Sequence, residues 1–439
     1  MTLIALQSSR AHSVLGQVLQ DAGDLAGAKH HYGTSISIND GDARVWYNLG
    51  TVLAEDPSEP FDGCLEAYHR AVDIDPELHV AWVNLGLAHK ALAMKEVGPT
   101  FSNAHTIPEE NKKMAERHLK HAMEAFEHVT SSAQLQSQSQ SQSQSQSRAT
   151  IEAAASATAS MEVEAAQHAI AVVQTALHCL GQSNRNNNNN NPSGGDAMLD
   201  TSPPRAPRAA SRGYLLQTFD GAAADTFNSR LLGTLKYSSH IAVVDALSQF
   251  YSTQNCEADP LLQVRAVLDL GCGTGLSGCA LRAHPSQLFA SCAIDGVDIS
   301  PRMCAHARAL SGVYRFVTEA DMETHLTTLV AQKQPVDLVV CTDVLIYKGD
   351  LEAVFDLVSA VLPRDGLGVF ALTVESLHHT DAEDYRLQLT GRYAHSERYI
   401  RALAAEHGFT ADMQSHSPRV ESGRPVQGQL WLLWRDEAS

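Results

Sequence analysis

The segment AVLDLGCGTGLSG, residues 266–278, holds residue types at spacings that can bind a nucleotide-like ligand. Gly271, Gly273 and Gly275 alternate directly after a short apolar run, and glycines let a ligand approach backbone N–H groups. A loop of this kind usually cradles phosphates. Asp269, however, stands two residues before the first glycine and would place a negative charge at the entrance of the loop.

Two classes of cofactor are bound by a strand, a glycine loop and a helix, with an acid on the next strand. Dinucleotide enzymes carry G-x-G-x-x-G, which Gly273, Gly275 and Gly278 match, and Asp298 follows at the typical spacing of about 20 residues. The Asp269 carboxylate would repel a pyrophosphate. It suits S-adenosylmethionine, which has no phosphate and carries an ammonium and a sulfonium cation. The sequence favours S-adenosylmethionine, with an NAD(P)-binding oxidoreductase as the alternative.

This stretch closely resembles the first motif of class I S-adenosylmethionine-dependent methyltransferases, and the similarity continues in order along the chain. The resemblance implies that Asp298 of GVDIS hydrogen-bonds the ribose hydroxyls. It implies that Asp321 of TEADMETHL meets the adenine amino group, with Met322 against the ring, and that Asp343 of VDLVVCTDVLIY lies near the methyl donor. The implied cofactor-binding residues are Asp269, Gly271, Cys272, Gly273, Gly275, Asp298, Ile299, Asp321 and Met322.

These residues also have structural explanations. Asp298 and Asp321 can each cap the helix that follows, and Met322 can belong to the core. Gly278 is expected to serve helix packing rather than phosphate binding. Asp269 has no such explanation, because an unpaired carboxylate at the buried end of a sheet is costly. Four acids in the order of the family together favour the ligand-binding interpretation.

Methyl transfer is an in-line displacement, so a catalyst must align the reacting atoms and exclude water. A base is needed only where the acceptor loses a proton. The candidates are Asp343, Tyr347 and His395, and His395 is preferred because imidazole titrates near neutrality. An ordinary surface or loop histidine is an equally good explanation of His395.

The flanking segments DTFNSRLLGTLKYSSH, GRYAHSERYI and RVESGRPVQGQLWLL resemble those of predicted methyltransferases that carry tetratricopeptide repeats. The acceptor is open between a small molecule and a protein, and a more distant resemblance to quinone-biosynthesis methyltransferases keeps a small aromatic acceptor possible. The resemblance implies that the acceptor cavity is faced by Tyr237, Tyr347, Tyr393, His395 and Arg419.

Alternating strand and helix patterns must position these residues. We expect an α + α/β protein: a helical tetratricopeptide solenoid, then a Rossmann-like seven-stranded class I methyltransferase domain at 214–439. A parallel sheet of this kind binds ligands beyond the carboxyl ends of its strands, where the glycine loop lies. Strands are expected at 265–270, 293–298, 313–317, 336–341, 367–374 and 429–434.

The N-terminal part, residues 1–130, repeats. Leu-Gly pairs recur at 15–16, 49–50 and 85–86, which resembles the tetratricopeptide repeat, and the glycine lets the two helices of a pair pack closely. Two repeats are regular and the third is interrupted by residues 96–113. Asn48 and Asn84 occupy equivalent positions and are expected to line a groove for a protein or peptide partner, or else to lie on a solvated helix face.

Low-complexity segments separate the two parts. The Ser/Gln tract at 131–149 and the Asn/Pro-rich segment at 182–213 are expected to be disordered linkers. Between them, residues 150–181 carry a helical stripe that ends at Gly181 and is expected to cap the repeats.

The composition excludes several classes of function. A net charge of −18, from 32 basic and 50 acidic residues, argues against binding to nucleic acid or anionic membranes. No apolar run approaches the roughly 20 residues needed to span a bilayer. The eight cysteines lack metal-ligand spacing and fit reduced thiols in the cytoplasm, so no metal is expected. We expect an active methyltransferase that recruits a protein; an adaptor with an inactive, cofactor-binding methyltransferase fold is the alternative.

Overall fold

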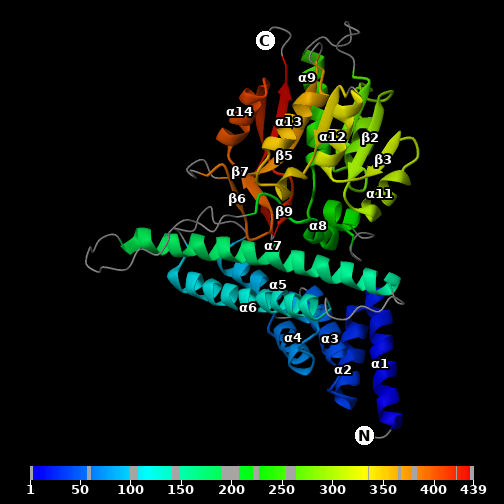
Figure 1. The fold of residues 1–439 in the computed structure, drawn as a ribbon, viewed down its shortest axis with the longest axis vertical. Coiled ribbons are helices and arrows are strands. Elements are labelled where there is room, and N and C mark those ends of the chain that lie inside the picture. Colours follow the sequence, from blue (N-terminus) through cyan, green and yellow to red (C-terminus); the bar gives the residue numbers. More distant parts are fainter. Residues whose placement is uncertain are drawn as a thin grey trace. The chain divides into compact units, whose positions relative to one another are not determined.

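The computed structural model describes residues 3–56, 61–98, 107–140, 149–188, 207–220, 227–253, 264–334, 336–363, 367–377, 383–421 and 423–435. The chain divides into two compact units, Met1–Ala206 with Gln388–Thr390, and Pro207–Leu387 with Gly391–Ser439 (Figure 1). Within the described ranges, every helix is too short or too polar to cross a membrane.

The N-terminal unit is built from helices that pack as consecutive pairs, followed by one long helix. Residues of the second helix in each pair contact the first helix of the next pair, so the pairs stack in chain order. The long helix α7 packs mainly on α6. The elements are α1 (Leu3–Asp21), α2 (Leu25–Ile38), α3 (Ala43–Glu55), α4 (Phe61–Ile74), α5 (His79–Val97), α6 (Glu109–Gln140) and α7 (Ala149–Asn188).

Each pair is closed by a glycine that lies against an aromatic ring of the second helix. A Cβ atom built on these glycines would approach the ring to 2.8, 2.5 and 2.6 Å, closer than real Cβ contacts allow. The close helix approach expected from the Leu-Gly pairs is therefore present three times, including in the interrupted third repeat. The contacts are Gly16 with Tyr32, Gly50 with Tyr68, and Gly86 with Phe126.

The helices extend further than the low-complexity composition predicts. Helix α6 continues to Gln140, inside the Ser/Gln tract, because adding residues to an existing helix needs no new nucleus. Helix α7 passes through Gly181, where we expected its end, since a glycine inside a helix costs only about 1 kcal/mol. The predicted linker residues 141–148 and 189–206 lie outside the described residues.

The C-terminal unit is organised around one mixed sheet of order β3-β2-β1-β4-β5-β11-β8. The first five strands along the chain are parallel, whereas β11 runs antiparallel between β5 and β8. Two short strands, β6 and β7, extend it beside β5. The strands are β1 (Ala266–Leu270), β2 (Ala293–Asp298), β3 (Phe316–Glu319), β4 (Leu338–Cys341), β5 (Val369–Ser376), β6 (Tyr385–Leu387), β7 (Tyr393–His395), β8 (Thr410–His416) and β11 (Gly428–Trp434), with a separate hairpin of β9 (Val420–Glu421) and β10 (Arg424–Pro425).

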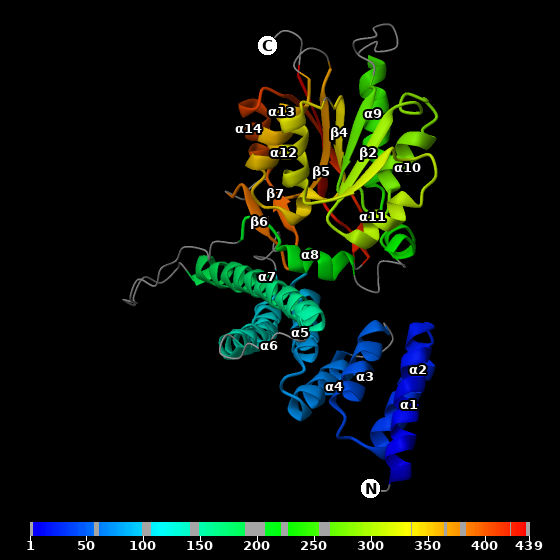
Figure 2. The ribbon, with the colours of Figure 1, turned by 45° about the vertical axis from the view of Figure 1, so that its right-hand side comes forward.

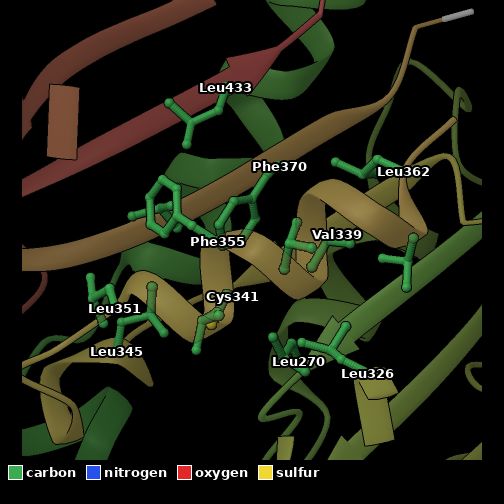
Figure 3. Packing of buried hydrophobic residues seen from close by; sticks show 14 of the residues in the cluster. Leu270, Leu326, Val339, Cys341, Leu345, Leu351, Phe355, Leu362, Phe370 and Leu433 are labelled. Carbon is green, nitrogen blue, oxygen red and sulfur yellow. The ribbon is translucent and has the colours of Figure 1, made fainter. Parts of the chain in front are cut away.

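Helices cover both faces of this sheet (Figure 2). On β1, Val267 packs towards α9, whereas Leu268 and Leu270 join the cluster formed with α12, α13 and α14. Figure 3 shows that second cluster, in which Leu270 appears next to Leu326 of α12, and side chains of β4, β5 and α13 make up much of the rest. The helices are α8 (Arg212–Phe219), α9 (Ser239–Thr253), α10 (Leu276–Ala283), α11 (Pro301–Arg308), α12 (Met322–Gln332), α13 (Glu352–Val361) and α14 (Glu397–Glu406).

The glycine–ring contacts predict a strong effect of a single methyl group. Gly50→Ala should destabilise the N-terminal unit by about 1–3 kcal/mol, because the added Cβ overlaps the Tyr68 ring. Gly33→Ala, also inside a helix but with no heavy atom within 4 Å of its Cβ position, should instead stabilise by about 0.5–1 kcal/mol. Urea unfolding followed by the helical circular dichroism signal measures both, and equal effects would contradict this packing.

Candidate functional site

A cavity of about 360 Å³ lies beyond the carboxyl ends of the central parallel strands. Its floor is formed by the loops after β1, β2, β3 and β4. The opposite wall comes from α8 and from the short helix η3 (Ser229–Thr234), with the aromatic rings of Phe219 and Phe227. A concave, mostly apolar space at this edge of an open α/β sheet is where such folds bind small ligands.

The carboxylate of Asp298, at the end of β2, organises the floor of the cavity. Its Oδ2 accepts a hydrogen bond of 2.9 Å from the Gly273 N–H, and its Oδ1 accepts one of 2.9 Å from the Ser300 N–H. Burial raises the pKa of Asp298, and these two N–H groups oppose that rise. Asp298 lines the cavity and has lone pairs left to accept hydroxyl donors from a ligand.

The glycine loop owes its shape to backbone angles that only glycine adopts easily. Gly271 and Gly273 have φ values of 77° and 53°. A Cβ on Gly271 would lie 2.4 Å from Val344, whereas the space beside Gly273 is open. Gly271, Cys272 and Gly273 line the cavity, as the sequence predicts for a ligand-binding loop.

Asp321 has one of the two roles that the sequence left open, and its position is compatible with the other. It caps α12, because its Oδ1 accepts hydrogen bonds from the N–H groups of Glu323 and Thr324 at 3.0 and 3.3 Å. It also lines the cavity, together with Met322 and with Ile299. The capping role therefore still leaves Asp321 at the cavity, and its contact with an adenine group stays a prediction.

Asp269 is placed differently from our expectation and does not line the cavity. It shares a face of β1 with Val267, under α10, because side chains alternate along a strand. The Tyr314 hydroxyl donates a 2.6 Å hydrogen bond to its Oδ2. Burial raises the pKa of Asp269 to about 7 against that hydrogen bond. The inference that its charge selects a cationic ligand is therefore wrong. Gly275, packed against Leu310, does not line the cavity either.

A buried ion cluster forms the far end of the cavity. Arg419 donates to Asp343 Oδ2 at 2.9 Å, to Glu421 Oε1 at 2.7 Å, and to Glu375. Arg392 donates to Glu375 at 2.7 Å and to Glu421 at 2.5 Å. Burial acts to raise the pKa of Glu421, but the two guanidinium groups hold it below its usual range. Three carboxylates share two guanidinium groups, so every cation of the cluster is paired and one formal negative charge is left over.

Asp343 belongs to the framework of the site rather than acting as a free base. Its backbone adopts a φ of 54°, directly after β4. Besides Arg419, its carboxylate accepts hydrogen bonds from the hydroxyls of Thr373 at 2.8 Å and Ser239 at 3.2 Å. Three donors leave little capacity to take up a proton from an acceptor.

Two further predicted residues, besides Asp269 and Gly275, lie outside the cavity. His395 is fully buried, and its Nε2 hydrogen-bonds the carbonyl oxygens of Lys348 and Gly349 at 2.9 and 3.2 Å. Burial lowers the pKa of His395 to about 4. The Tyr393 hydroxyl donates 2.6 Å to the Pro207 carbonyl. The assignments of His395 as base and Tyr393 as acceptor contact are corrected: both side chains hold loops in place.

Tyr237 and Tyr347 do line the cavity, as the sequence predicts. The Tyr347 ring meets Phe219 edge-on, and the Tyr237 ring stacks on His240. Burial raises the pKa of both phenols, so they are neutral hydrogen-bond donors at neutral pH. The described lining contains no histidine.

The wall formed by α8 is attached at both ends to the floor. Asp220, directly after α8, accepts hydrogen bonds from Ser300 Oγ at 2.8 Å and from the Arg302 N–H at 2.9 Å. Before the helix, the Ala210 N–H donates 2.8 Å to the Tyr347 carbonyl. The α8 wall is therefore bonded to the first turn of α11, and the Asp298 carboxylate accepts a hydrogen bond from the start of the same turn.

Sequence reasoning missed several residues of the site. Arg392 and Glu421 lie in segments whose resemblance was noted, but their partners are far apart in the chain and no spacing reveals them. The η3 segment also lies in a stretch whose resemblance was noted, but neither it nor α8 is marked as a cavity wall, because a wall is made by tertiary packing. The missed lining residues include Phe219, Phe227, Arg230, Arg392 and Glu421.

In the N-terminal unit, both predicted groove residues bind neighbouring helices. Asn48 Nδ2 donates to Gln17 Oε1 at 3.2 Å, and Asn84 Nδ2 donates to the Tyr47 hydroxyl at 3.5 Å. These contacts join α3 to α1 and α5 to α3. Their function towards a peptide stays a prediction.

Comparison with known proteins identifies the C-terminal unit. Residues 268–367 match a family model described as a methyltransferase domain. Together with the strand order, this shows that the chain contains a methyltransferase domain with a Rossmann-like mixed sheet. A search of curated proteins finds no match.

Solved structures with partial similarity cover one unit or the other. An S-adenosylmethionine-dependent methyltransferase from Mesorhizobium loti is 17% identical over 42% of this chain and 98% of its own, with a TM-score of 0.29. The plantazolicin methyltransferase BpumL, in complex with SAH, is 11% identical over 51% of this chain and 94% of its own (TM-score 0.35). The TPR domain of Arabidopsis OM64 is 17% identical over 28% of this chain and 84% of its own (TM-score 0.21). Because these TM-scores are low, the methyltransferase domain is assigned from the matched family model and the strand order alone.

The burial of Asp269 predicts a pH dependence of stability. Its pKa is about 7 in the folded chain against 3.8 ordinarily, so the folded state holds the extra proton between these values. Stability is therefore lost as the pH rises from 4 to 7, by up to about 1.4 kcal/mol per pH unit. In Asp269→Asn, which still accepts from Tyr314, this loss should vanish. Urea unfolding of both proteins between pH 5 and 8 is the measurement, and parallel pH profiles would contradict the assignment.

Proposed function

We propose that the chain is an S-adenosylmethionine-dependent methyltransferase. The observation that carries the proposal is the Asp298 carboxylate, held at the end of β2 by the glycine loop inside a matched methyltransferase domain. An acid in this position can accept two ribose hydroxyls. Dinucleotide enzymes share that acid, but their sheet of order 3-2-1-4-5-6 has no antiparallel strand inserted beside β5.

The described residues fit the cofactor. Ile299 and Met322 offer apolar surface for an adenine ring beside Asp321. The open backbone at Gly273 lets the ligand approach the loop without meeting a side chain. Asp298 and Asp321 both line this end of the cavity, and Asp321 is the carboxylate that the dinucleotide pattern does not include.

The mechanism that these residues support is alignment. S-adenosylmethionine, when bound, supplies a methyl group on a positively charged sulfur. Arg419, Thr373 and Ser239 fix Asp343 and thereby the loop after β4. Phe219 and Phe227 cover the cavity with apolar surface that excludes water, and the neutral hydroxyls of Tyr237 and Tyr347 can orient an acceptor. Because the described lining lacks a free base, the acceptor enters as a competent nucleophile. Orientation of that kind contributes several kcal/mol, about 7–11 at best.

The N-terminal unit supports a second part of the proposal, recruitment of a protein that is acceptor or scaffold. Its repeats share more than the glycine contacts. Trp46 Nε1 donates to the Asp40 carbonyl at 2.8 Å, and Trp82 Nε1 donates to the Pro76 carbonyl at 3.0 Å. Stacks of such helix pairs, as in tetratricopeptide proteins, present extended binding surfaces.

The role of Asp298 is tested by cofactor binding. Asp298→Ala should weaken binding of S-adenosylhomocysteine by at least about 1–2 kcal/mol, because ribose hydroxyls lose a charged acceptor. Asp295→Ala is the control: it lies on the same strand, pairs with Arg315 at the surface and does not line the cavity. Isothermal titration calorimetry measures the affinity of the full-length wild type and of the two variants for S-adenosylhomocysteine. Equal affinities would contradict the assignment of Asp298 to the ribose.

Activity is tested by transfer of a radiolabelled methyl group. The full chain and cell extract are incubated with labelled S-adenosylmethionine, and label in protein is separated from label in small molecules. Label that depends on the wild-type chain and is lost with Asp298→Ala supports the enzyme. Tight cofactor binding without any transferred label would support the adaptor instead.

Arg230 is proposed to bind the carboxylate of the cofactor's amino-acid end. It follows Asn228, whose Oδ1 accepts a 2.6 Å hydrogen bond from Thr274 of the glycine loop. In the described part of the chain Arg230 forms neither an ion pair nor a hydrogen bond through its side chain, whereas Lys348 pairs with Glu323 at 3.0 Å. A free guanidinium beside the loop suits a carboxylate.

Arg230→Gln should therefore weaken S-adenosylhomocysteine binding about fivefold, the size expected for an exposed ion pair of about 1 kcal/mol. Binding of 5′-methylthioadenosine, which lacks the amino-acid end, should not change. Calorimetric titration with both ligands separates the two, and an equal loss for both would show that Arg230 acts on the fold instead.

A further inference from the structure

The first helix of every repeat carries an apolar seam with the spacing i, i+4, i+7. In α3 and α5 this seam is covered by the second helix of the preceding pair, so that it belongs to the core between repeats. The glycines Gly16, Gly50 and Gly86 set the register between the repeats. The covered seams are Val45, Leu49 and Val52 on α3, and Ala81, Leu85 and Ala88 on α5.

The same register places Ala11, Leu15 and Val18 on the seam of α1, where the described chain offers no preceding helix to cover them. Leu15 is 43% exposed and Val18 57% exposed, whereas their equivalents on α5 are nearly buried. The neighbouring Val14 is 57% exposed as well. These apolar side chains form one patch on one face of α1, of the kind that marks an interaction site.

The charges on this face are arranged for self-association. Arg10, Val14, Val18 and Asp21 follow one another at helical spacing along α1, so the apolar patch has a cation at one end and an anion at the other. Both charged residues are exposed. The Asp21 Oδ1 accepts from Gln17 on the same helix at 3.0 Å, which leaves its other oxygen available.

An antiparallel copy of α1 complements this pattern. If two copies cross between Leu15 and Gly16, Arg10 of each lies opposite Asp21 of the other, because both are equally far from the crossing point. The apolar side chains then meet in the middle. A two-fold axis produces both ion pairs at once, as an isologous interface requires.

We propose that two copies of this chain associate through antiparallel α1 helices. We assign a second copy, rather than an unrelated helix, as the partner. An antiparallel α1 presents its anion opposite the cation of the first α1 and its cation opposite the anion. A single helix pair buries less surface than a standard interface, so the dimer is weak and forms at micromolar concentrations. The inference does not depend on the proposed enzymatic function.

The test is the mass of the full chain in solution, measured by sedimentation velocity from about 1 to 100 micromolar. The wild type should shift from monomer to dimer. Val14→Glu with Val18→Glu should raise the dissociation constant at least tenfold. Leu87→Glu, which changes an apolar residue of α5 that is 41% exposed, should leave it unchanged. Circular dichroism confirms that each variant keeps its helices.

A charge exchange tests the register. Arg10→Asp alone should weaken the dimer, because like charges then face each other, and Arg10→Asp with Asp21→Arg should restore it. A chain that stays monomeric throughout overturns the proposal, even if it captures another protein. So does a dimer that the two glutamates on α1 do not affect. Failure of the double exchange to restore association overturns the antiparallel pairing.

Discussion

The hydrogen bonds accepted by the Asp298 carboxylate are the constraint on which the catalytic unit depends. One oxygen holds Gly273 in the loop after β1, and the other holds Ser300 at the start of α11. Ser300 in turn donates to Asp220, which anchors the wall formed by α8. The floor and the wall of the cavity therefore depend on one buried carboxyl side chain. A change of charge at this position affects loop geometry as well as ligand affinity, so its two contributions are coupled.

How much the sequence predicts depends on the range of the interaction involved. The glycine loop, Asp298, Asp321 and the central strands follow from local patterns, because strand, turn and cap are decided within a few residues. The antiparallel pairing of β11 with β5 does not follow from local patterns. The two strands are far apart in the chain, and no spacing in the sequence shows which strands will pair. The prediction that His395 acts as a base was wrong for the same reason. Its residue type indicates a base, but its burial against backbone carbonyls comes from tertiary packing.

The buried ion cluster shows what kind of site such packing can create. Arg392 and Arg419 come from different segments and reach carboxylates on β5, on β9 and after β4. Removing one member would leave an uncompensated buried charge, which costs far more than the net stabilisation of the intact pair. The cluster therefore fixes this end of the cavity rigidly, and its carboxylates are engaged by guanidinium groups. Catalysis by alignment is consistent with this rigidity.

Asp269 shows how one carboxylate can be important in a sequence motif without touching a ligand. Alternation along β1 turns it under α10, where Tyr314 donates to it and also fills the space beside Gly275 and Gly278. Its pKa is raised to about 7 by burial, and it acts on the cavity from behind the lining residues Cys272 and Tyr237. Asp298 and Asp321, in contrast, line the cavity directly, at the end proposed to bind the nucleoside. The acid of the motif thus lies under α10 beside Tyr314, whereas Asp298 at the end of β2 and Asp321 after β3 line the cavity.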